Sequence, residues 1–123
     1  MAKDGGIIIV GPCASGKTSL AEKLTEAGHP ARQVAQEHSY VPTMWQKMSQ
    51  PDTLIFLDSS FETSTRRKSL NWDREEYEIQ QERLQHAREH CDLYIDTDDL
   101  SEQEVLEQAL AALHGGQSAA QSL

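Results

Sequence analysis

Residues 11–18 are the part of the chain whose residue types and spacing point most specifically to chemistry. Their letters, GPCASGKT, fit the pattern G-x-x-x-x-G-K-[ST] at every fixed position. Glycines let the backbone curl until successive N–H groups face one concavity, and a following helix adds the positive end of its dipole. Lys17 supplies a mobile charge for β- and γ-phosphates, and the Thr18 hydroxyl is a ligand for the Mg²⁺ that bridges them. The pattern predicts binding of ATP or another nucleoside triphosphate with Mg²⁺.

The predicted phosphate contacts extend over the whole loop and one residue beyond it. They come from Gly11, Pro12, Cys13, Ala14, Ser15, Gly16, Lys17, Thr18 and Ser19. The alternative is a glycine turn that binds nothing. Cys13 also has two interpretations: a thiolate activated by the helix N-terminus, or a small side chain at an unconstrained loop position.

Positioning such a loop requires a buried strand before it and a helix after it, and the chain supplies both. Apolar runs typical of buried strands occur at Ile7–Val10, Thr53–Asp58 and 92–96, with a weaker one near 32–36. Helical patterns follow at 17–27, 42–50, 61–70, 73–91 and 101–113. Gly28 ends the first helix, and a capping box, Ser101 with Glu104, opens the last. Alternating strands and helices predict an α/β domain with a parallel sheet.

Three stretches together resemble the P-loop kinases of the nucleoside-monophosphate and shikimate kinase type. They are GPCASGKTSL, LIFLDSSFETSTRRK and ERLQHAREHCDLYIDTDDLSEQEV, and the first is the most specific. The resemblance implies a three-layer P-loop NTPase fold: a small, mostly parallel sheet flanked by helices. No strand fits between Tyr40 and Thr53, so about four strands are expected, in the order 2-1-4-5 of the kinases' numbering. We expect one domain over residues 1–114, a lid-like segment at about 61–91, and a disordered tail at 115–123.

The resemblance also implies roles for particular side chains. In such kinases an acid at the end of the second strand serves the acceptor, and Glu37 stands there, with His38 as a second candidate base. The alternative is that both are loop residues on an acidic surface. The loop 97–101 corresponds to the one that lies against adenine. Asp58 ends an apolar strand and could ligate Mg²⁺, although the family does not usually place its metal ligand there.

Arginines after the strand Thr53–Asp58 are candidates for contacts with the transferring phosphate. Arg66 and Arg67 follow that strand closely, and a guanidinium can hold phosphate oxygens in a planar bidentate contact. A purely structural alternative is a salt-bridged helix, in which Arg74 and Glu78 are four residues apart. Trp45 and Trp72 could stack on a base or pack in the core.

Composition narrows the possible partners. The net charge of −9 argues against nucleic acid, although residues 66–88 hold six of the eleven lysines and arginines against five acids. No apolar run approaches the roughly 18 residues that cross a bilayer, so no membrane partner is expected. The N-terminal apolar run is shorter than a secretory signal requires, and we expect a cytoplasmic protein. His86 and His90 could share a metal ion, or simply form a polar helix face.

Two functions remain open at this stage. The first is an ATP- and Mg²⁺-dependent kinase that transfers a phosphoryl group to an unidentified small-molecule acceptor, with Lys17, Glu37, Arg66 and Arg67 as its catalytic residues. The second is a nucleotide-binding module or slow ATPase that has no such acceptor. A GTPase is disfavoured, because the chain has no N-K-x-D guanine motif.

Overall fold

The computed structural model describes the chain except for residues 1–5, 13–14, 42, 46–52, 69–73 and 123, and it describes only the backbone of residues 114–122. Four strands and their helices alternate along the chain. In order they are β1 (Ile7–Val10), α1 (Lys17–Glu26), β2 (Ala31–Gln33), the 3₁₀ helix η1 (Gln36–His38), β3 (Thr53–Asp58), α3 (Phe61–Lys68), α4 (Arg74–His90), β4 (Leu93–Asp96) and α5 (Glu102–Ser122).

The four strands form one sheet in the order β2-β1-β3-β4, and every pairing is parallel. Ile7 lies opposite Ala31 on one side and Thr53 on the other, and Ile55 lies opposite Leu93. The predicted α/β class is therefore confirmed, as is the predicted spatial order of the four strands. Parallel pairing brings the carboxyl ends of all four strands to one edge, where ligands bind in open α/β sheets.

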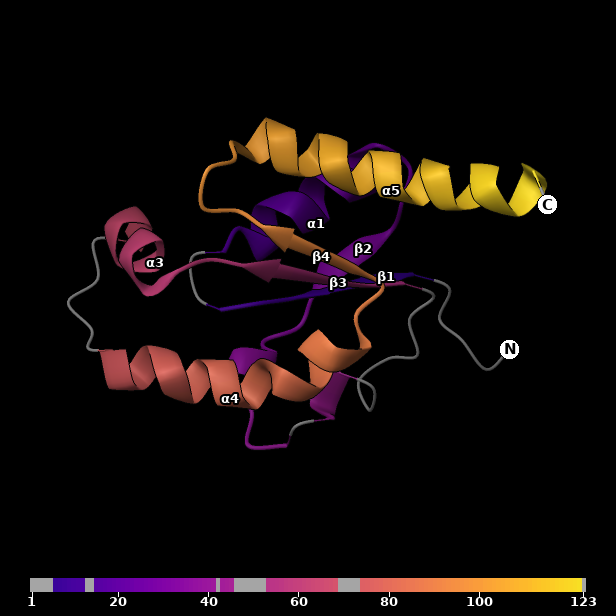
Figure 1. The fold of residues 1–123 in the computed structure, drawn as a ribbon. Helices are drawn as coiled ribbons and strands as arrows, with labels where there is room; N and C mark the ends of the chain where they lie inside the picture. Colours follow the sequence, from indigo (N-terminus) through magenta and orange to yellow (C-terminus); the bar gives the residue numbers. More distant parts are fainter. Residues whose placement is uncertain (1–5, 13–14, 42, 46–52, 69–73, 123) are drawn as a thin grey trace.

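Helices cover both faces of the sheet (Figure 1). Helices α1 and α5 lie over one face, and α4 lies over the other. The central strands supply alternate residues to the two sides: Ile9 and Ile55 pack with α1 and α5, whereas Ile8 and Phe56 pack with α4. Because β1 and β3 are covered on both faces, their sequences are continuous apolar runs rather than alternating ones.

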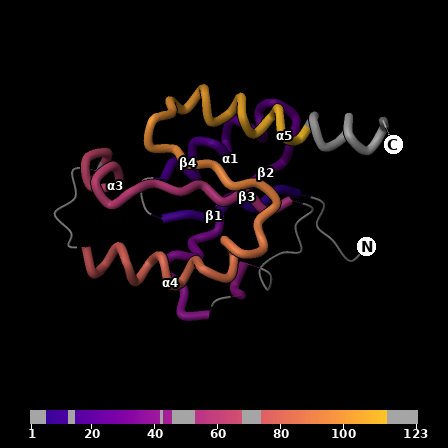
Figure 2. Tube along the Cα trace, in the orientation of Figure 1, coloured from indigo at the N-terminus to yellow at the C-terminus, as the bar shows by residue number. Residues whose placement is uncertain are grey.

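Helix α3 belongs to neither layer. It follows the carboxyl end of β3 and stands at the edge of the sheet beside the loop that leaves β1 (Figures 1 and 2). Helix α4, by contrast, is tied to the core, because Leu84 and Ala87 are fully buried there. The segment predicted as a lid, 61–91, thus contains one helix at the sheet edge and one that forms a layer of the domain.

Several element boundaries differ from those predicted. Strand β2 spans Ala31–Gln33 rather than 32–36, and the chain turns into η1 at Gln36. Helix α5 continues to Ser122, where the sequence pattern predicts a disordered tail from residue 115. The continuation crosses Gly115 and Gly116, which lower helix propensity but keep the N–H groups that the helix needs. Most of the helix predicted at 42–50 lies outside the described residues.

The ends of α1 and α5 agree with their capping signals. Gly28 adopts a left-handed conformation, φ +95°, just after α1. At the start of α5 the Glu104 N–H donates to Ser101 Oγ at 3.1 Å, and the Ser101 N–H donates to Glu104 Oε1 at 2.8 Å. Among the described residues, none of the helices has the length and apolar character needed to cross a membrane.

Candidate functional site

The loop between β1 and α1 depends on two glycines for different reasons. At Gly11 a Cβ atom would lie 2.0 Å from the Leu57 carbonyl oxygen and 2.8 Å from Ser15 Oγ, so the backbone passes too close to β3 for any side chain. Gly16 has open space around it but a left-handed backbone, φ +96° and ψ 19°, at the N-cap of α1. Only glycine adopts that conformation at little cost. Two residues of the loop, Cys13 and Ala14, lie outside the described residues.

The N-terminus of α1 carries no side-chain cap. Its N-cap residue, Gly16, has no side chain, and the first turn contains no acidic residue. The positive end of the helix dipole therefore meets no acidic side chain from the first turn of its own helix. Thr18 and Ser19 stand in that first turn, and Thr18 is exposed. An anion could be bound here by backbone N–H groups, and the Thr18 hydroxyl could reach a cation beside it.

Lys17 lies folded back over the loop rather than extended into solvent. Lys17 is only 8% exposed to solvent. Its ammonium donates to the carbonyl oxygens of Gly11 at 2.9 Å and Pro12 at 3.2 Å, and to Glu37 Oε2 at 2.9 Å. The structure thus brings together two residues, Lys17 and Glu37, that are twenty positions apart in the sequence.

Glu37 is held in place by its neighbour Gln36. The Gln36 side chain is fully buried. Its amide nitrogen donates to the carbonyl oxygens of Val41 at 2.8 Å and Arg83 at 3.2 Å, and its amide oxygen accepts from the backbone N–H of Trp45 at 2.9 Å. These bonds fasten η1 to α4 and to the segment after η1. The short 3₁₀ turn is therefore fixed in position, and its next residue, Glu37, faces the loop after β1.

The Glu37 carboxylate is buried and only half satisfied. The residue is 3% exposed, and Oε1 has no hydrogen-bond partner among the described residues. Oε2 binds Lys17 and lies 3.7 Å from His38 Nε2. Arg83 donates to the Glu37 backbone oxygen at 3.3 Å, not to its carboxylate. The two sequence-derived candidate bases, Glu37 and His38, are thus adjacent in space, and Glu37 is the one buried beside the lysine.

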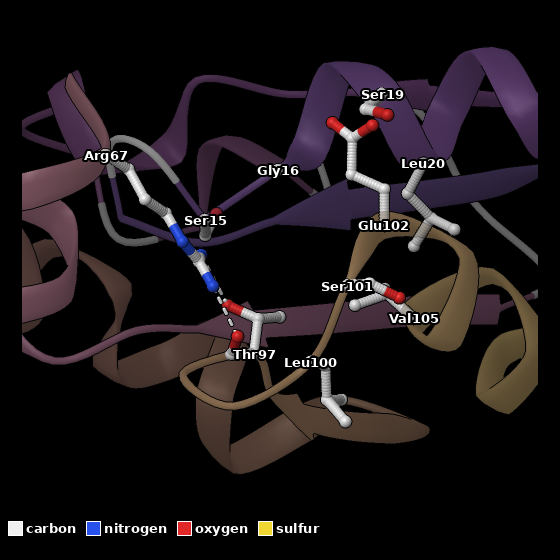
Figure 3. A pocket seen from close by; sticks show the side chains of 10 residues that line it. All are labelled: Ser15, Gly16, Ser19, Leu20, Arg67, Thr97, Leu100, Ser101, Glu102 and Val105. Carbon is white, nitrogen blue, oxygen red and sulfur yellow. Dashed lines mark hydrogen bonds between the residues drawn. The ribbon is translucent and has the colours of Figure 1, made fainter.

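A cavity of about 470 Å³ opens on the other side of the loop. It lies between the start of α1, the loop from β4 to α5, and α3 (Figure 3). Its walls are partly apolar and partly polar, and the lining residues are Ser15, Gly16, Ser19, Leu20, Arg67, Thr97, Leu100, Ser101, Glu102 and Val105. The hydroxyl of Ser15 is buried, with no hydrogen-bond partner among the described residues. The loop 97–101 predicted to lie near a base forms one wall.

Arg67 closes one side of this cavity. From α3 it reaches across to the loop after β4, where it donates to Thr97 Oγ1 at 2.9 Å and also to the Thr97 carbonyl oxygen (Figure 3). Thr97 Oγ1 in turn donates to the Asp58 carbonyl oxygen at 2.8 Å. Arg66 is exposed on α3 and is not among the residues that line the cavity. The structure therefore distinguishes the two arginines, which the sequence could not.

Asp98 links the start of α3 to the loop after β4, and the sequence analysis assigned it no role of its own. Burial alone would raise the pKa of Asp98, but hydrogen bonds from Ser60 and Thr63 and the positive charge of Arg67 outweigh burial and lower that pKa. The Ser60 N–H donates to Asp98 Oδ1 at 2.8 Å. Asp98 thus joins the start of α3 to the loop after β4. An acid two residues after the end of a strand is the signal that could have suggested it.

Asp58 occupies a different environment from the one expected of a Mg²⁺ ligand. Its carboxylate accepts hydrogen bonds from the Ser59 N–H at 2.9 Å, from Gln81 at 3.3 Å and from the Tyr94 hydroxyl, and Arg88 lies 3.5 Å away. Burial, followed by this hydrogen bond, raises the pKa of Tyr94 well above its ordinary value. Binding a metal ion would disrupt these contacts, so the arrangement favours a role for Asp58 in joining β3 to α4 and β4.

His86 and His90 form a packed pair on α4 rather than an open metal site. Their rings stack at a centroid distance of 4.2 Å, and the Trp45 indole N–H donates to His86 Nδ1 at 3.2 Å. Within the described part of the chain there is no group of three or more metal-ligating side chains. Trp45 is 5% exposed and belongs to the core on the α4 side, so it packs rather than stacking on a ligand. Trp72 lies outside the described residues.

Comparisons with known proteins identify no family for this chain. No protein-family model matches it, and no curated protein matches its sequence significantly. Its function must therefore be argued from the loop, the cavity and the buried pair Lys17–Glu37.

Proposed function

We propose that the chain binds ATP with Mg²⁺ at the loop after β1 and transfers the γ-phosphoryl group to a small-molecule hydroxyl. The observation that carries the proposal is the complete 11–18 motif at the uncapped N-terminus of α1, with Lys17 folded over it. The residues of the 11–18 motif other than Pro12, which has no N–H, would hold the phosphates through backbone N–H groups, and Lys17 would add its ammonium. Thr18 would supply a hydroxyl to Mg²⁺, which would neutralise phosphate charge when bound. Asp58 is left out of this metal site.

The cavity beside the loop suits the base of the nucleotide. Its volume of about 470 Å³ falls within the range of roughly 300–1,000 Å³ found for small-molecule sites. Leu20, Leu100 and Val105 give it apolar walls, and the Arg67 guanidinium offers a flat cationic one. The resemblance to P-loop kinases implies adenine at the corresponding loop, 97–101. Both the phosphates and the base would thus contact the same end of α1.

The buried carboxylate of Glu37 favours transfer to an acceptor over simple nucleotide binding. In the proposed reaction the acceptor hydroxyl gives its proton to Glu37, its oxygen bonds to the γ-phosphorus, and the bond to the bridging oxygen breaks, leaving ADP with the electron pair. An acid with no role beyond the surface would be exposed to solvent, whereas Glu37 is only 3% exposed and lies beside the lysine that would bind the phosphates.

The competing function is a nucleotide-binding module or slow ATPase. It is favoured by the small sheet, which has four strands among the described residues and none between β2 and β3. If the acceptor pocket of longer kinases is missing, water could be the only acceptor. The two functions share the nucleotide site and differ in what stands beside Glu37.

Calorimetric titration with ATP–Mg²⁺ tests the shared part of the proposal. Binding should be measurable in the wild-type protein and reduced at least about tenfold in Lys17→Met. Lys23→Met, which removes a lysine from the same helix outside the site, should bind as the wild type does. Incubation with γ-labelled ATP and a pool of small metabolites then separates the alternatives. A labelled organic product supports the kinase, whereas label found only in inorganic phosphate supports the ATPase.

A further inference from the structure

The ammonium of Lys17 has no spare hydrogen-bond donor in this structure. An ammonium group has three N–H donors, and three acceptors lie within bonding distance: the carbonyl oxygens of Gly11 and Pro12, and Glu37 Oε2. A phosphate oxygen can therefore bind Lys17 only if one of these acceptors gives up its bond. The nucleotide and Glu37 consequently compete for the same cation.

Glu37 is the acceptor that such competition affects most. It carries a full negative charge, and its side chain is 5% exposed, so losing its cation would leave a charge buried without compensation. The charged and titratable groups that face it are few among the described residues. On η1, His38 Nε2 lies 3.7 Å from Oε2 and its side chain is 58% exposed; on α4, Arg83 bonds the Glu37 backbone oxygen. Within the described part of the chain, Lys17, on α1, is the only lysine or arginine whose side chain is bonded to the carboxylate.

We infer that ATP binding takes Lys17 away from Glu37 and thereby converts Glu37 from the counter-ion of the lysine into the base for the acceptor. This inference rests on the proposed function and adds a specific coupling to it. When phosphates take the lysine, Glu37 loses a positive neighbour and gains negative ones, and both changes increase its affinity for a proton. A carboxylate that binds protons more strongly is a better base near neutral pH.

The second carboxylate oxygen of Glu37 is the atom at which an acceptor hydroxyl could bind. Glu37 Oε1 is buried and has no partner among the described residues. A buried acceptor without a donor is unfavourable, so it is positioned to accept a hydrogen bond from a ligand that enters beside the loop. A hydroxyl bound there meets a weak base while Lys17 holds the carboxylate, and a stronger one once ATP is bound. The coupling thus predicts that nucleotide binding precedes productive acceptor binding.

Proton uptake measured by calorimetry tests the exchange without any acceptor. A non-hydrolysable ATP analogue with Mg²⁺ is titrated at about pH 6.5 in buffers of different ionisation enthalpy, so that the dependence of the heat on the buffer gives the protons taken up. The wild-type protein should take up a clear fraction of a proton more than Glu37→Gln does. Glu37→Gln should also bind the analogue about three- to tenfold more tightly, because the competing negative charge is gone.

Two further variants separate Glu37 from its surroundings. Glu22→Gln makes the same change in charge at an exposed position of α1 and should match the wild type in both uptake and affinity. His38→Gln should keep most of the uptake, because the inference assigns the proton to the carboxylate. Infrared difference spectra of the wild-type protein provide a measurement that needs no variant, since analogue binding should produce the C=O stretch of a protonated carboxyl group.

The outcomes distinguish this inference from the proposed function. Equal proton uptake in wild type and Glu37→Gln, or weaker analogue binding in Glu37→Gln, would overturn the exchange while leaving the nucleotide site standing. The absence of a carboxyl band in the infrared spectrum would do the same. If the wild-type protein shows no binding of the analogue at all, the proposed function fails and the exchange fails with it.

Discussion

Replacement of Gly11 by alanine is the sharpest test of how the loop after β1 is built. The added Cβ would lie 2.0 Å from the Leu57 carbonyl oxygen, far inside van der Waals contact. Leu57 cannot move aside cheaply, because it is fully buried in β3 and that strand pairs with both β1 and β4. Overpacking of this kind costs about 1–3 kcal/mol, occasionally more. We expect the upper end, about 3 kcal/mol, since the clash is with backbone and not with a movable side chain.

Two other glycines provide matched controls for this substitution. Gly16 and Gly28 have nearly equal positive φ angles, +96° and +95°, and a Cβ on either would meet no atom within 4 Å. Alanine at each should therefore cost only the strain of a left-handed residue, about 1–2 kcal/mol. The expected order of destabilisation is Gly11→Ala first, then Gly16→Ala and Gly28→Ala close together. Gly16→Ala should also weaken ATP binding, whereas Gly28→Ala, at the far end of α1, should not.

Urea unfolding followed by circular dichroism measures these differences. At constant slope, the midpoint of each variant converts directly into a change in the free energy of unfolding. ATP affinity is then compared among the variants that remain folded. If Gly11→Ala unfolds at the same urea concentration as Gly28→Ala, the conclusion that the loop passes too close to β3 for a side chain at Gly11 is wrong. If Gly16→Ala and Gly28→Ala bind ATP equally well, the conformation at the start of α1 does not matter for phosphate binding.

Three further predictions concern charged groups of the site. Lys17→Met should lower the free energy of unfolding measured in urea, because it leaves the Glu37 carboxylate buried without a cation. Adding Glu37→Gln should restore part of that free energy in a double-mutant cycle. Equal destabilisation of the single and double variants would contradict the buried pair. Arg67→Met should weaken ATP binding about tenfold by calorimetry, while Arg66→Met should not, because only Arg67 lines the cavity. The pKa of Asp98 is lowered from 3.8, so its stabilising effect is complete above that value and is lost as the pH falls through its folded-state pKa; acid unfolding of Asp98→Asn should show a weaker pH dependence at these acidic pH values, and an unchanged profile would argue against the hydrogen bonds from Ser60 and Thr63.

The sequence predicted the parts of the fold that depend on local pattern. Strands β1 and β3 are buried on both faces, so their apolar runs are continuous and stand out in the sequence. The glycine spacing of residues 11–18 is readable from the sequence as a motif, although only Gly16 answers a constraint of its own backbone, whereas Gly11 answers the close approach of Leu57 on β3. The order of the strands followed from the resemblance and from the absence of a further strand pattern. Strand β2 was harder to place, since it is an edge strand of three residues with only one apolar side chain, Ala31.

The roles of individual polar residues depended on contacts that no local pattern encodes. Asp58 ends its strand as a metal ligand might, yet residues 23, 30 and 36 positions away supply donors to its carboxylate. Arg66 and Arg67 are neighbours in sequence, but their side chains leave α3 in different directions, and only Arg67 reaches Thr97. Asp98 was overlooked because its partners, Ser60 and Thr63, lie on another element. Long-range packing, not propensity, decides such roles.

The distribution of unsatisfied polar atoms supports the proposed location of the site. A buried polar atom without a partner costs roughly 1–3 kcal/mol, so a small domain can keep few of them. Three such side-chain atoms occur among the described residues: Ser15 Oγ, Glu37 Oε1 and Arg88 Nε. Two of the three belong to residues beside Lys17, one in its own loop and one bonded to it. A packing defect would have no reason to favour that lysine, whereas a site awaiting phosphates and a hydroxyl would leave its acceptors open there.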